Sequence, residues 1–173
     1  MTRKILIALC VLFVMPVFVI TGCDEVQENL SPKSSFIADF SCEYRKMNIT
    51  GKLSASGKKL INISLDSPNT VSGLSVTYKG SDIEISRENM LCSADEAYIP
   101  ESSFPNITKE IIYGIADGRA VFEGKCDDVC TYRLDSAFGK AVVSTNSKGC
   151  ISKISVDGED YEMVLSDVKD ANG

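Results

Sequence analysis

The chain has 173 residues, 24 of them acidic and 18 basic, a formal net charge of −6, and neither histidine nor tryptophan. This length is enough for one domain of ordinary size with a real hydrophobic core. The acidic balance argues against a nucleic-acid partner, and the lack of histidine removes the commonest general base and metal ligand. We therefore expect no enzyme activity, no cofactor and no bound metal.

The N-terminus has the pattern of an export signal. Arg3 and Lys4 precede an unbroken apolar run at residues 5–20 that contains Pro16. At about 1.5 Å per residue this run spans roughly 24 Å, short of the ~30 Å hydrocarbon core of a bilayer. Proline also interrupts a helix. We expect a signal peptide over residues 1–22 rather than a transmembrane helix.

The residues Ile20-Thr21-Gly22-Cys23, directly after the apolar run, resemble the lipobox of bacterial lipoproteins. The resemblance implies cleavage before Cys23 and a diacylglyceryl group on its thiol, with the protein held on the outer face of the bacterial cytoplasmic membrane. Loss of residues 1–22 would leave a net charge of about −8, so covalent lipid rather than charge would bind the membrane. The alternative is a secreted protein in which Cys23 is a disulfide partner.

Five cysteines remain after Cys10 and Cys23, and an odd number leaves at least one thiol free or paired with another molecule. They are Cys42, Cys92, Cys126, Cys130 and Cys150. If Asp127-Asp128-Val129 forms a hairpin loop, Cys126 and Cys130 flank it as a cross-strand pair, which makes them the disulfide candidate. Their spacing does not fit a redox motif, and further metal ligands are missing.

From residue 36 onward the dominant hydrophobic period is two, which is typical of strands. Strands are predicted at 36–44, 47–55, 61–65, 74–78, 83–85, 120–126, 130–134, 141–145, 151–156 and 161–165. One segment changes period: Asn106 is predicted to cap a helix that starts at Ile107 and ends between Gly114 and Gly118. Residues 90–100 are expected to be irregular, with Met90-Leu91 and Tyr98-Ile99-Pro100 as a rim or lid.

One long meander with a single helix predicts a mainly β (α+β) fold. We expect an antiparallel curved sheet or half-barrel with one covering helix, and a β-sandwich is the alternative. The expected organisation is a lipidated Cys23 with a tether at 23–35, one β domain at 36–168, and a tail at 169–173.

The order of elements carries a second resemblance. A strand ending in Asp66-Ser67-Pro68, a strand beginning at Ser72-Gly73-Leu74, a short hairpin, one helix and closing hairpins are similar to the lipoprotein-carrier superfamily typified by LolA and LolB. The resemblance implies a half-barrel whose apolar face holds acyl chains or a lipidated partner protein, with no catalytic residues. The alternative is a solid core in an envelope protein that binds other proteins; the oligomeric state is not predicted.

The predicted lining consists of apolar residues from the strands and the helix. These residues are Phe40, Tyr44, Ile49, Leu53, Ile63, Leu65, Leu74, Val76, Ile83, Ile111, Ile112 and Ile115. Any half-barrel also needs such residues to pack against its helix, so a packed core remains the competing interpretation.

Overall fold

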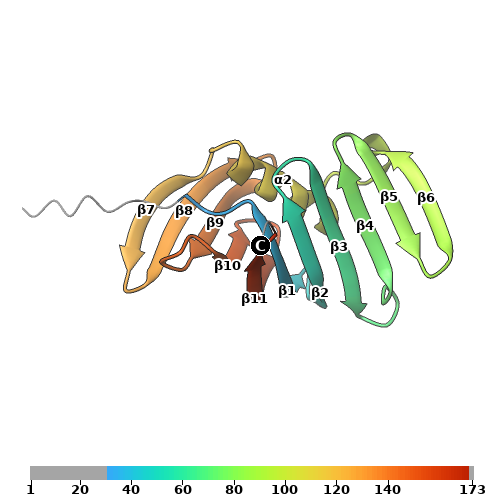
Figure 1. Cartoon of the computed structure of the whole chain (residues 1–173), viewed down its shortest axis with the longest axis horizontal. Helices are drawn as coiled ribbons and strands as arrows, with labels where there is room; N and C mark the ends of the chain where they lie inside the picture. The colour runs from blue at the N-terminus through green and yellow to red at the C-terminus, as the bar shows by residue number, and fades with distance from the viewer. Residues whose placement is uncertain (1–30, 172–173) are drawn as a thin grey trace, which may run out of the picture.

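The computed structural model describes residues 31–171, and the predicted signal peptide and Cys23 lie outside them. One sheet of eleven antiparallel strands is accompanied by a short 3-10 turn, η1 (Glu96–Tyr98), and one helix, α2 (Phe104–Ala116). The strands are β1 (Ser35–Tyr44), β2 (Met47–Ser56), β3 (Leu60–Ser67), β4 (Leu74–Lys79), β5 (Asp82–Arg87), β6 (Met90–Asp95), β7 (Val121–Cys126), β8 (Val129–Ser136), β9 (Gly139–Thr145), β10 (Ile151–Val156) and β11 (Tyr161–Asp170). The predicted curved, unclosed sheet with one helix is confirmed, and the sandwich is excluded (Figure 1).

The first and last strands meet in the middle of the sheet. The strand order is β6-β5-β4-β3-β2-β1-β11-β10-β9-β8-β7, so β1 pairs with β11. The chain therefore builds one half outward from β1 to the β6 edge, crosses through η1 and α2, and returns from the β7 edge (Figure 1). The helix is the connection between the two edges, which places it against one face of the sheet, here termed the helix side.

Alternation in the sequence decides which side chains reach the helix side. In β1, Phe36, Ala38 and Phe40 are buried, whereas the residues between them are partly or fully exposed. On the far side, polar groups bond to one another: the Asn62 amide donates to Ser75 Oγ at 2.8 Å and to Thr77 Oγ1 at 2.7 Å. The central strands thus have one apolar and one hydrated face, as expected for an antiparallel sheet covered on one side, whereas the edge strands β6 and β7 contain no buried residue.

The helix starts earlier than the sequence pattern predicted. Its first residue is Phe104, with Ser103 at the N-cap and Pro105 in the first turn, where a missing N–H costs nothing. Asn106 is not the cap; it is buried and hydrogen-bonded inside the fold. At the other end the helix continues through Gly114, where an added Cβ would lie 2.6 Å from Leu134 Cδ1, so glycine permits close packing on β8.

Two other boundaries differ. Residues 90–95 are not irregular but form the edge strand β6, paired with β5 from Arg87↔Met90 to Asp82↔Asp95. The last strand continues to Asp170, into the predicted tail, because it pairs with the start of β1 through Phe36↔Asp170. Within residues 31–171, no helix is long and apolar enough to span a bilayer.

Candidate functional site

The centre of the helix side is a packed core. Ile111 and Ile112 of α2 and Ile63 of β3 have no exposed surface, and Phe40 and Ile115 are almost as deeply buried. Interiors of this kind are packed as densely as organic crystals. This part of the predicted lining therefore supports the fold rather than an open cavity under the helix.

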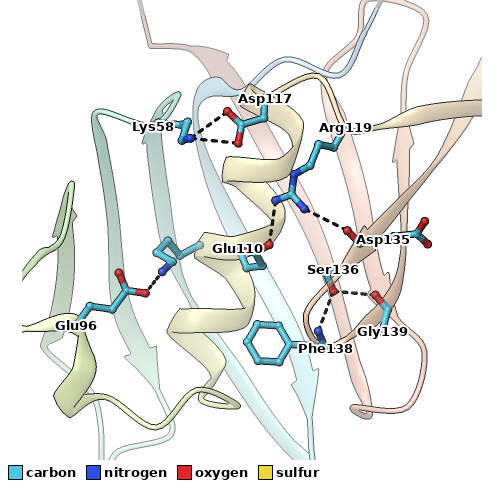
Figure 2. A network of polar contacts seen from close by, with 10 residues as sticks. Lys58, Glu96, Glu110, Asp117, Arg119, Asp135, Ser136, Phe138 and Gly139 are labelled. Atoms are coloured by element: carbon cyan, nitrogen blue, oxygen red, sulfur yellow. Dashed lines mark hydrogen bonds and ion pairs between the residues drawn. The ribbon is translucent and has the colours of Figure 1, made fainter.

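Polar contacts fix α2 along both flanks (Figure 2). At its C-terminal end, Lys58 of the β2–β3 turn forms an ion pair with Asp117 at 3.0 Å. On the β8 flank, the Arg119 guanidinium pairs with Glu110 at 2.9 Å and donates to the Asp135 carbonyl at 3.2 Å. These contacts join the helix to both halves of the sheet.

The third polar attachment is largely buried. The Lys109 ammonium pairs with Glu96 of η1 and lies 5.5 Å from the centroid of the Tyr78 ring and 5.6 Å from that of Tyr113. Burial lowers the pKa of Lys109, and the charge of Glu110 opposes that shift. The ion pair and the two aromatic faces together hold the crossing segment at η1 against the helix.

An aromatic cluster sits where the helix begins. The Phe104 ring centroid lies 5.7 Å from that of Phe40, 6.1 Å from that of Tyr44 and 6.0 Å from that of Tyr161. The Tyr44 hydroxyl donates to the Ser102 carbonyl, just before the helix. Such ring pairs contribute beyond their buried area, so Tyr44 and Phe104 form a rigid wall.

That wall closes one side of an apolar hollow of about 250 Å³ between the start of α2 and strands β2–β4. The lining residues are Tyr44, Met47, Ile49, Leu65, Pro68, Thr70, Val71, Leu74, Val76, Phe104 and Pro105. Only Thr70 and Tyr44 among them carry a hydroxyl, and the Tyr44 hydroxyl is already bonded to Ser102. The hollow offers hydrocarbon contact with little polar recognition.

A second, wider hollow of about 600 Å³ adjoins the first at Leu74, which lines both. It lies on β4–β6, and its lining residues are Leu74, Ile85, Arg87, Asn89, Met90, Leu91 and Cys92. The register places Met90 and Cys92 opposite Arg87 and Ile85, so these four side chains share the helix side. Met90 is nevertheless 68% exposed. The two hollows together are here termed the apolar groove.

Five of the twelve predicted lining residues lie in the groove: Tyr44, Ile49, Leu65, Leu74 and Val76. The other seven, Phe40, Leu53, Ile63, Ile83, Ile111, Ile112 and Ile115, are buried in the core. Sequence reasoning placed Met47 in a strand but not in the lining, and it missed Pro68, Val71 and the start of the helix, because these follow from turn positions rather than from strand alternation. Met90 and Leu91, predicted as a rim, do line the groove, although as part of a strand.

The predicted cysteine pairing rests on a loop that the structure does not form. The hairpin turn contains two residues, Asp127 and Asp128, and the register pairs Cys126 with Val129 and Lys125 with Cys130. Successive residues of a strand point to opposite faces, so the side chains of Cys126 and Cys130 lie on opposite faces of the sheet. Both are free thiols, as are Cys42, Cys92 and Cys150. Over residues 31–171, no group of three or more cysteine or acidic side chains is arranged to hold a metal ion.

No family model matches the chain, and no curated protein matches it either. Among solved structures, an uncharacterized conserved protein from Thermus thermophilus is similar, with a TM-score of 0.50 and 11% identity over 84% of this chain and 82% of that one. A LolA superfamily protein from Nitrosomonas europaea aligns with a TM-score of 0.43 and 14% identity, over 83% of this chain and 89% of that one. At 11% identity, the likeness to the Thermus thermophilus protein concerns the fold alone.

Proposed function

We propose that this protein is a non-catalytic, membrane-anchored lipoprotein of the bacterial envelope that binds a hydrophobic chain in the apolar groove. The observation that carries the proposal is the groove itself: a hydrocarbon-lined hollow with a rigid aromatic wall, continuous with exposed apolar surface on β5 and β6. Exposed apolar surface that is contiguous and concave usually marks a binding site.

The dimensions favour a narrow chain. The first hollow, at about 250 Å³, lies below the range of roughly 300–1,000 Å³ typical of compact small-molecule pockets. An acyl chain can enter it and continue over Leu74 into the second hollow. Each buried methylene contributes about 0.8 kcal/mol, so affinity should rise about fourfold for each methylene added while the groove still has room.

The position of the groove is compatible with an anchor at Cys23. The chain enters the sheet beside the β2–β3 turn, where Gly57 N–H donates to the Ser34 carbonyl at 3.0 Å, and Lys33 N–H donates to the Gly149 carbonyl at 2.9 Å. The groove lies at the other end of β1, β2 and β3, around Tyr44 and Met47. An anchor attached to the entering chain would leave the groove accessible.

Two measurements test the proposal. The chain from residue 24 onward contains every described strand and the helix; purified from a bacterial host and extracted with solvent, it should yield stoichiometric lipid by mass spectrometry. Separately, intact mass of the full chain extracted from membranes should show a diacylglyceryl group on Cys23, and Cys23→Ala should abolish both the added mass and the membrane fraction. Absence of bound lipid after reconstitution with acyl chains would exclude the groove function, and an unmodified Cys23 would exclude the anchor.

A second candidate function is protein recognition at the β6 edge. In the described sheet β6 has a strand neighbour on one side only, and it exposes Met90 and Leu91. Free edges accept an added strand from another chain. This function predicts that Ser93→Lys, an exposed position on β6 outside both hollows, weakens partner capture and leaves lipid content unchanged.

A further inference from the structure

The groove contains one cationic side chain that has no carboxylate partner, and this side chain bears on which class of ligand the groove binds. Among residues 31–171 there are four arginines, and three of them form ion pairs. These pairs are Arg45–Glu159 at 2.9 Å, Arg119–Glu110 at 2.9 Å and Arg133–Glu123 at 3.5 Å. The fourth, Arg87, forms no ion pair within the described part of the chain and only donates to the Thr70 carbonyl at 3.4 Å, a long hydrogen bond.

Arg87 lies at the junction of the two hollows. It is the last residue of β5 and is directly opposite Leu74 in the β4–β5 register, so the two side chains lie on the same face of the sheet. Leu74 lines both hollows, Arg87 lines the second, and Thr70 lines the first. The guanidinium therefore lies between the first hollow, which is lined by hydrocarbon, and the more open second hollow.

The strand pattern makes a charge at this position unusual. Along β5 the residues that face the helix side are Ile83, Ile85 and Arg87 in succession, and Ile83 is fully buried. A third apolar residue would extend the row. Arg87 is instead half-buried beside Met90, and its hydrogen bond to Thr70 is exposed, so a ligand headgroup can reach the guanidinium.

From this placement, and resting on the proposed function, we infer that the groove takes an anionic amphiphile, with its acyl chain in the hollows and its acidic headgroup bound by Arg87. Guanidinium binds carboxylate or phosphate oxygens through two parallel N–H donors, and it is permanently charged. The shared chemistry is an acyl chain with an oxyanion in its headgroup, whether the source is the carboxylate of a fatty acid or the phosphate of a phospholipid.

The test compares two ligands that share a chain and differ in headgroup charge: decanoate and decanamide, titrated calorimetrically into the chain from residue 24 onward. We expect decanoate to bind about tenfold more tightly than decanamide, the gain typical of a hydrogen-bonded charge pair. Arg87→Gln should remove this preference by lowering decanoate affinity far more than decanamide affinity, and Arg87→Lys should restore part of it. Arg133→Gln, which removes an arginine from the other half of the sheet, is the matched control.

The outcomes separate the two proposals. Binding of neither ligand overturns the proposed function, and this inference with it. Equal affinity of the wild-type protein for both ligands overturns only the assignment of Arg87. An equal loss of both affinities in Arg87→Gln also overturns it, because a merely structural role of Arg87 would produce that result. If Arg87→Gln does not fold, Arg87→Lys takes its place, and a decanoate preference undiminished by that change overturns the assignment. Replacing decanoate by decyl phosphate then shows whether carboxylate or phosphate is preferred.

Discussion

The Tyr78 hydroxyl donates a hydrogen bond of 2.7 Å to the side-chain oxygen of Asn106, and both residues are buried. Tyr78 belongs to β4 and Asn106 to the first turn of α2. The Asn106 amide donates in turn to the Pro100 carbonyl at 3.2 Å. One side chain thus fixes the sheet, the helix and the segment before the helix together, beside the groove.

Tyr78→Phe should destabilise the domain by about 1–3 kcal/mol, because it leaves the buried Asn106 oxygen without its donor. Chemical denaturation followed by circular dichroism measures the change. Tyr98→Phe is the control, since Tyr98 is 83% exposed and its loss of a hydroxyl should be neutral. Equal stability of the Tyr78→Phe variant would mean that water or another group satisfies Asn106.

The fold could be predicted from sequence because strand alternation and turn residues act locally. The period of two in residues 36–44 appears directly as the buried face of β1. The β6 strand could not be predicted in this way: Met90, Leu91 and Cys92 are consecutive apolar residues without alternation, and only pairing with β5 makes them a strand. The local sequence predicts Asn106 as a helix cap. Its actual role, a hydrogen bond with Tyr78, depends on a residue 28 positions away and leaves no local signal.

Gly51→Ala should destabilise the domain by at least about 3 kcal/mol or prevent folding. The added methyl group would overpack the sheet, and only a costly shift of the backbone could make room for it. A Cβ at this position would lie 1.9 Å from the Ser64 backbone oxygen of the neighbouring strand. Gly124→Ala is the matched control, because nothing lies within 4 Å of the Cβ it would add. Thermal unfolding of the two variants should therefore differ widely, and similar melting temperatures would contradict the packing of β2 on β3.

Val71→Trp should fill the first hollow and reduce decanoate affinity at least about tenfold. The methylene groups of the ligand that the indole excludes from the hollow would no longer be buried. Val71 lines that hollow from the β3–β4 loop, where a larger side chain need not disturb the core. Val164→Trp on β11 is the control; Val164 is 46% exposed and belongs to neither hollow. Unchanged affinity in Val71→Trp would place the ligand elsewhere.

The candidate site could be predicted only in part, for a physical reason. Alternation identifies every residue on the helix side but cannot say which of them the helix covers. Ile63 and Val76 face each other across β3 and β4 and both are buried, yet only Val76 lines the groove. The difference arises from where α2 crosses the sheet, and the sequence of a strand carries no signal for that.

Stability should decline at alkaline pH through buried groups that resist ionisation. Burial raises the pKa of Cys42 from 9.0 to about 12, and it also raises the pKa of Tyr78 and of Tyr161 above 10.0. A folded-state pKa above the unfolded value means that stability is fully present below about pH 9 and is lost as the pH rises toward 12. Denaturant midpoints across this range measure the decline, and Cys42→Ala should make it shallower. A flat profile would mean that these groups are hydrated.

Alkylation of the native chain, from residue 24 onward, by iodoacetamide at pH 8 without reductant should label the cysteines in order of exposure. Cys92 and Cys126 are exposed and should react first, and Cys130 and Cys150, which are partly buried, should follow. Cys42 is fully buried, and with its pKa near 12 only about one thiol in ten thousand is ionised, so it should react only after unfolding. Because the β7–β8 register directs Cys126 and Cys130 to opposite faces, both should be labelled. If Cys126 and Cys130 both resist alkylation and the mass of the chain is lower by two hydrogens, the two form a disulfide and the register of the hairpin is shifted.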